Sequence, residues 1–162
     1  MEEAEIKNIS KVWERVYSDD GVTEAPQDQG QSLTAMLREF IDDEAMDAAT
    51  YTLLAVKTKG TPGEKLLKNL AEDERRHERS LQSEYFLLTG DTWTPRKRYP
   101  SAPYLLSALR ERFIAEQRGA DKYEETAKTV TDEQLRTVLF ELARDERRHA
   151  RELRRLVERM IY

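Results

Sequence analysis

The chain contains no cysteine and little glycine or proline, with 6 Gly and 5 Pro in 162 residues. The lack of cysteine excludes thiol catalysis, disulfides, iron–sulfur clusters and cysteine-ligated zinc sites. The scarcity of turn residues disfavours an all-β fold, which needs many turns. The longest apolar runs, such as residues 53–56, are far too short to span a membrane, and the acidic residues 1–5 are unlike a signal peptide. We therefore expect an all-α protein of the cytoplasm.

Charged residues are abundant, but the two signs nearly balance. They make up 36% of the chain, with 27 basic and 32 acidic side chains and a net charge of −5. An isoelectric point near 5.3 disfavours broad nucleic-acid binding, which requires a basic face. The composition is typical of long helices with solvated outer faces. We expect neither a nucleic acid nor a membrane as partner.

The spacing of apolar residues predicts one short helix and four long ones. Apolar side chains recur at helical spacing in residues 2–17, and residues 18–31 form a polar linker. With Ser32 as the expected N-cap, the long helices are predicted over about 32–57, 64–88, 102–129 and 132–160. These predicted helices divide the chain into two units, an N-terminal helix with its linker over 1–30 and a four-helix domain over 31–162.

The connections between the long helices predict their topology. The first and third connections are short, so each joins an antiparallel helical hairpin, about 33–88 and 105–160. The middle connection is long and polar, and about twelve extended residues reach ~40 Å, the length of a helix of this size. Such a link can run the length of the bundle. This arrangement is the ferritin-like four-helix bundle with one long crossover.

The two predicted hairpins are copies of one another. Residues 70–79 read LAEDERRHER and residues 142–151 read LARDERRHAR, an offset of 72 residues from Leu70 to Leu142. The same offset relates Glu44 to Glu116 and Tyr51 to Tyr123. An uninterrupted repeat of this kind predicts a pseudo-two-fold bundle in which equivalent positions meet near the axis.

A glutamate interrupts the apolar seam near the middle of each long helix, at Glu44, Glu74, Glu116 and Glu146. The glutamates of the second and fourth helices are each followed three residues later by a histidine, His77 or His149. Four buried carboxylates are either mostly protonated or neutralised by cations, because a bare buried charge costs several kcal/mol. Two divalent metals would balance them, and the Glu-x-x-His pairs suit iron or manganese. This set of residue types is the di-metal pattern of helical bundles.

These residues give the chain a resemblance to the rubrerythrin-type, ferritin-like di-iron proteins, over about residues 31–160. The resemblance implies two carboxylate-bridged irons that react with peroxide or oxygen. It implies a bridging role for Glu74 and Glu146, terminal ligation by Glu44 and Glu116, and one histidine, His77 or His149, on each metal. Manganese or a mixed pair is the alternative to two irons.

The resemblance also implies roles for several residues that surround the metals. Asp73 and Asp145 are expected to hydrogen-bond the histidine of the opposite half, and Tyr51 and Tyr123 to lie beside the metals as candidate catalytic residues. Rubrerythrins usually carry a further glutamate at the position of Gly119. Its equivalent in the first half is Asp47, which could substitute as a ligand or only accept hydrogen bonds.

The predicted function is that of a di-iron redox protein, a peroxidase or oxidase. The alternative is metal handling without catalysis: ferrous iron oxidation, binding or delivery. A bundle with a vestigial site is a third option, disfavoured by intact candidate ligands in both halves. No CxxC pair occurs, so the family's rubredoxin domain is not expected here, and electrons are expected from a separate donor protein or from the metal itself. A homodimer is expected, and Trp13 is predicted to pack on the bundle or on a second subunit.

Overall fold

The computed structural model describes residues 27–161, which form four helices. They are α2 (Gln27–Lys57), α3 (Pro62–Thr89), α4 (Leu105–Thr129) and α5 (Glu133–Ile161). No strand occurs in this range, so the all-α prediction is confirmed. The predicted helix over 2–17 and Trp13 lie outside the described residues, as do residues 18–26 of the predicted linker. The prediction of a linker over residues 27–31 is wrong, because these residues belong to α2. None of the helices between residues 27 and 161 has the length and apolarity needed to cross a membrane.

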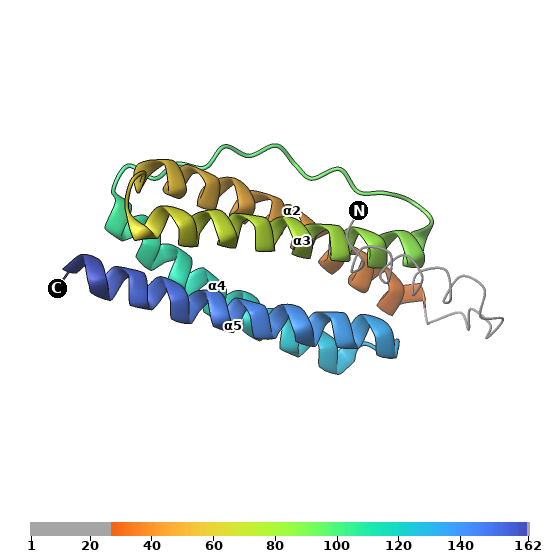
Figure 1. The fold of residues 1–162 in the computed structure, drawn as a ribbon. Helices are drawn as coiled ribbons and strands as arrows, with labels where there is room; N and C mark the ends of the chain where they lie inside the picture. The colour runs from red at the N-terminus through yellow and green to blue at the C-terminus, as the bar shows by residue number, and fades with distance from the viewer. Residues whose placement is uncertain (1–26, 162) are drawn as a thin grey trace, which may run out of the picture.

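The helices form two antiparallel hairpins joined by one long strap (Figure 1). Helix α2 packs along α3, and α4 packs along α5. Residues 90–104 leave the end of α3, run the length of the bundle and begin α4 at the opposite end, so α4 runs parallel to α3. The predicted ferritin-like bundle with a lengthwise crossover is therefore confirmed.

Local sequence explains where the helices begin and end. The Thr61 hydroxyl accepts a hydrogen bond from the Gly63 N–H at 3.2 Å, and Pro62 occupies the first position of α3. Gly90 ends α3 with φ +75°, a conformation that favours glycine. Helix α2 begins at Gln27, earlier than predicted. The expected N-cap at Ser32 is wrong, because the preceding glutamines are good helix formers and extend the helix through Gly30.

The core is divided into two apolar clusters by the middle of the bundle. One cluster includes Leu37, Leu81 and Leu139, and the other includes Leu54, Leu70 and Leu153. All six leucines are fully buried. The glutamates and histidines of the interrupted seams lie between these clusters, where apolar packing at both ends keeps water from their side chains.

The strap is fastened to α2 through one buried carboxylate. Asp42 is 1% exposed and accepts hydrogen bonds from the Trp93 indole N–H at 3.0 Å and the Arg96 backbone N–H at 3.0 Å. The Arg96 guanidinium donates to its other oxygen at 2.6 Å. Arg38 lies over the Trp93 ring at 4.8 Å from its centre. These contacts fix the strap at the level of the glutamates.

Candidate metal centre

Six side chains from the four helices converge in the middle of the bundle. Glu44 lies on α2, Glu116 on α4, and each Glu-x-x-His pair occupies one face of α3 or α5 because residues three apart share a helix face. All six side chains are buried: Glu44, Glu74, His77, Glu116, Glu146 and His149. The structure thus brings together every residue that the sequence analysis named as a metal ligand.

The six residues form two overlapping groups that could each hold one ion. One group consists of Glu44, Glu74, His77 and Glu146, and the other of Glu74, Glu116, Glu146 and His149. The ligand atoms of each group lie within 4.8 Å of one another. Glu74 and Glu146 belong to both groups, which is the position that a bridging carboxylate would occupy. We call the two positions the His77 position and the His149 position.

The two nitrogens of each histidine face different partners. Nε2 of His149 lies 3.2 Å from the Asp73 carboxylate, and Nε2 of His77 lies 3.4 Å from that of Asp145. Each aspartate belongs to the opposite hairpin from the histidine it contacts, as the resemblance implied. A carboxylate at Nε2 favours a proton there, which leaves Nδ1 free to bind a metal.

The nitrogen and oxygen atoms that point into the centre lie close together and lack hydrogen-bond partners, as the ligands of a cation would. Nδ1 of His77 lies 2.9 Å from Glu74 and 3.1 Å from Glu146, and Nδ1 of His149 lies 3.0 Å from Glu74. Among the described residues, the buried side-chain atoms left without a hydrogen bond all belong to this centre: both Glu74 oxygens, one oxygen each of Glu116 and Glu146, and both Nδ1 atoms. Buried polar atoms are normally paired. Unpaired nitrogen and oxygen atoms gathered at one place fit metal ions.

The acid–base properties of the centre reflect the crowding of like charges. Burial and the neighbouring Glu74 carboxylate raise the pKa of Glu44 to about 8, and burial with Glu116 and Glu44 raises that of Glu146. Burial opposes ionisation of Glu74 as well, but contacts with His149 and His77 outweigh it and lower its pKa to about 2. In the metal-free protein, protons therefore supply part of the positive charge in the centre, and binding of metal must displace them.

The two tyrosines contact the terminal glutamates across the bundle. The Tyr51 hydroxyl donates to Glu116, and the Tyr123 hydroxyl donates to Glu44. Burial and the adjacent carboxylates raise the pKa of both phenols. Both hydroxyls therefore remain protonated at neutral pH and serve as hydrogen-bond donors that orient the two glutamates.

Asp47 belongs to neither group of candidate ligands. Its carboxylate forms an ion pair with Arg112 of α4. Burial raises the pKa of Asp47 to about 7, against the opposing effect of the arginine. Asp47 accepts a hydrogen bond from Arg112, and a role as metal ligand stays a prediction.

Arg148 is a residue that the sequence analysis did not single out. Its guanidinium lies 2.8 Å from Asp73 and 3.3 Å from Asp145, the two aspartates that contact the histidines. The signal was present in the repeated sequence, since an arginine precedes both histidines, Arg76 and Arg148. Arg76 also pairs with Asp73, at 2.5 Å. Despite burial, the contacts with the two histidines, together with these arginines, keep the pKa of both aspartates below its usual value.

Comparison with known proteins agrees with this geometry. The Rubrerythrin family model matches residues 107–162. The second hairpin is rubrerythrin-like. The match spans most of α4 and all of α5, and so includes Glu116, Glu146 and His149. The predicted resemblance to rubrerythrin-type proteins is confirmed over this range, and the repeat extends the same residue pattern to α2 and α3.

One similar solved structure supports the fold of the whole bundle. A hypothetical protein from Pyrococcus furiosus superposes with a TM-score of 0.65 and 25% identity, covering 75% of this chain and 88% of that one. No curated protein sequence matches this chain. The rubrerythrin-like pattern and the convergent buried ligands together indicate a metal-binding protein, with iron as the metal most typical of the family.

Proposed function

We propose that this protein is a cytoplasmic di-iron redox protein that reduces hydrogen peroxide, or oxygen, at the centre between α3 and α5. The observation that carries the proposal is the set of unpaired buried nitrogen and oxygen atoms supplied by Glu74, Glu116, Glu146 and the two histidines. Hard carboxylate oxygens favour the ferric over the ferrous state. Two bound ferrous ions would supply the two electrons that, with two protons, reduce one peroxide to two waters.

The protein's own residues would orient the ligands and exclude water. Tyr51 and Tyr123 hold Glu116 and Glu44, and Asp73 and Asp145 keep a proton on Nε2 of the two histidines. The apolar clusters on either side close the centre from the ends of the bundle. Since the chain has no cysteine, we propose that a separate protein returns the electrons. Assembly as a homodimer stays a prediction.

The test is stopped-flow mixing of protein loaded with ferrous iron, without oxygen, against hydrogen peroxide and against oxygen. We expect oxidation of two ferrous ions per peroxide, and loss of about one tightly bound metal per chain in His77→Ala or His149→Ala, because each removes the only nitrogen ligand of one position. Glu72→Ala, an exposed change on α3, is the matched control. A loaded protein that binds two irons but reacts with neither oxidant would contradict the redox proposal and leave metal handling as the function.

A further inference from the structure

The internal repeat is broken at several pairs of positions beside the centre, and two of these pairs involve one ion pair. Asp47 on α2 corresponds to Gly119 on α4, and Arg112 on α4 corresponds to Phe40 on α2, each at the offset of 72 residues. The Asp47–Arg112 ion pair at one corner therefore has a glycine and a phenylalanine as its counterpart at the other. Since Glu44, Glu116 and their bridging partners obey the repeat, the asymmetry lies in what surrounds the ligands.

A cavity of about 650 Å³ lies between α2 and α4 and reaches the centre at one corner. Glu44, Glu146 and Tyr123 line it. Their repeat equivalents, Glu116, Glu74 and Tyr51, are not among its lining residues. Glu44 belongs only to the His77 position, and Glu116 belongs only to the His149 position. Since Glu44 lines the cavity and Glu116 does not, the cavity opens onto the His77 position.

The ion pair accounts for the closed corner. Asp47 and Arg112 both line the cavity, with side chains only 24% and 20% exposed. Asp47 lies near enough to Glu116 and Glu74 for their charges to act on its carboxylate, so the pair lies beside that edge of the centre. Two joined side chains fill the space through which a small molecule would have to pass.

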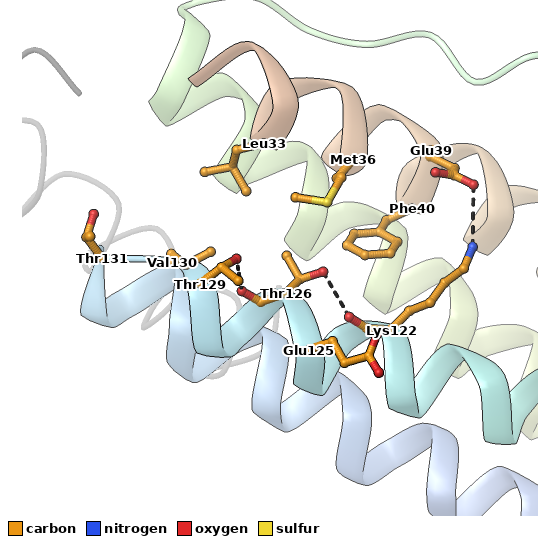
Figure 2. A pocket seen from close by; sticks show the side chains of 10 residues that line it. All are labelled: Leu33, Met36, Glu39, Phe40, Lys122, Glu125, Thr126, Thr129, Val130 and Thr131. Carbon is orange, nitrogen blue, oxygen red and sulfur yellow. Dashed lines mark hydrogen bonds and ion pairs between the residues drawn. The ribbon is translucent and has the colours of Figure 1, made fainter. Parts of the chain in front are cut away.

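Gly119 accounts for the open corner. A Cβ atom at this position would lie 3.7 Å from the Glu146 carboxylate, an ordinary contact, while a longer side chain would extend into the space beside Glu146. Past Phe40 and Lys122 the cavity adjoins a second, apolar hollow of about 550 Å³. Figure 2 shows Leu33, Met36 and Phe40 on the α2 side of this hollow, and Lys122 reaching from α4 to Glu39.

We propose that Gly119 forms the entrance for small exogenous ligands to the centre, and that the Asp47–Arg112 pair closes the equivalent route. A ligand of two or three heavy atoms, such as peroxide or azide, then binds at the His77 position only, one for each pair of metals. The proposal rests on the proposed metal centre, but it concerns access and not reactivity.

Azide binding to the ferric protein, followed by visible absorption, tests the entrance without any turnover. The unaltered protein should bind one azide per two irons. Gly119→Leu should weaken azide binding at least about tenfold, which corresponds to about 1.4 kcal/mol, because the leucine side chain would fill the space beside Glu146 that azide has to enter. Gly119→Ala, whose Cβ fits, should bind within about twofold of the unaltered protein. Iron content is measured for every variant.

The repeat provides a matched test at the equivalent corner. The double change Asp47→Ala with Arg112→Ala removes the two side chains that fill the equivalent route. A second azide per two irons should then bind, at the His149 position. If Gly119→Leu loses iron, Met46→Trp fills the same cavity from α2 and should weaken azide binding instead.

Three results would overturn the proposal: unchanged azide affinity when the cavity is filled, a single azide in the Asp47–Arg112 double variant, or two equivalent azides per centre in the unaltered protein. Failure of the redox proposal is separable from these. A protein that ignores peroxide but binds one azide in a Gly119-dependent manner retains the entrance and loses the proposed reaction.

Discussion

Each histidine of the centre is held by two different kinds of contact. Nε2 faces an aspartate of the opposite hairpin, and Nδ1 faces the carboxylates of the centre. Arg148 contacts both Asp73 and Asp145. The aspartate contacts of the two histidines therefore form one connected network that links α3 to α5. These contacts fix the orientation of each ring before a metal arrives. Once Nδ1 loses its proton, they leave the remaining proton on Nε2, the tautomer that metal binding requires.

Removal of one aspartate should weaken metal binding without removing a ligand. Asp73→Ala takes away the acceptor at 3.2 Å from Nε2 of His149, so the ring loses its fixed orientation and tautomer. We expect affinity for one ferrous ion to fall about 10- to 100-fold. Competition with a chelator measures it, with the exposed crossover residue Asp91→Ala as the control. Equal affinity in Asp73→Ala and the unaltered protein would show that the aspartate does not act on the metal.

The candidate ligands could be predicted from the sequence because they obey two simple rules. Glu74 and His77 lie on the apolar seam of a helix, and the repeat places a second copy, Glu146 and His149, opposite them. The Asp47–Arg112 pair could not be predicted in this way. It joins two helices of different hairpins, breaks the repeat, and depends on side-chain conformations that helical periodicity does not determine.

At the scale of elements, the strap is as specifically placed as the helices. The sequence predicted its length and course, since a polar stretch between two hairpins has to span the bundle. It did not predict the anchor, because Asp42 is one of many acidic residues on α2. The Arg96 side chain is 68% exposed and yet pairs with Asp42, so a basic residue on a polar loop can carry a specific contact.

Loss of the anchor should destabilise the fold. Asp42→Ala leaves the Trp93 indole and the Arg96 backbone N–H without their acceptor, and hydrogen bonds to a charged group contribute roughly 1.5–3 kcal/mol each at most. We expect the free energy of unfolding to fall by about 2–4 kcal/mol in urea denaturation. The adjacent Asp43→Ala, at a carboxylate 45% exposed, is the control and should change it by less than about 1 kcal/mol.

At the scale of the whole molecule, the bundle encloses more negative charge than it can hold without protons or metals. Each hairpin brings two glutamates to the centre, and the apolar clusters on either side exclude water from their carboxylates. The same geometry that makes the centre suitable for metal makes the metal-free protein dependent on protons. Folding, protonation and metal binding are therefore linked.

This linkage predicts an unusual pH dependence for the metal-free protein. Glu44, with a pKa raised to about 8, and Asp47, raised to about 7, keep protons in the folded state that the unfolded chain releases near pH 4. Burial lowers the pKa of His149, but contacts with Asp73, Glu116 and Glu74 outweigh it and raise this pKa to about 12. Above pH 6.5 the unfolded chain loses the proton of this histidine while the folded protein keeps it, so His149 also makes stability fall with rising pH. Between pH 5.5 and 8 the folded state binds more protons than the unfolded chain. The free energy of unfolding should therefore fall over this range, by about 1.4 kcal/mol per pH unit for each additional proton that the folded state holds.

Thermal unfolding of chelator-treated protein at pH 5.5, 7 and 8 measures this slope. Glu44→Gln, which carries no charge at any of these pH values, should reduce the decline because one of the retained protons is no longer needed. Protein loaded with divalent metal should show the opposite trend, since the ligands must be deprotonated and metal affinity rises with pH. The stabilisation by metal should thus widen steadily from pH 5.5 to 8. A metal-free protein that becomes more stable over this range would mean that the four glutamates are not held together in a water-poor centre.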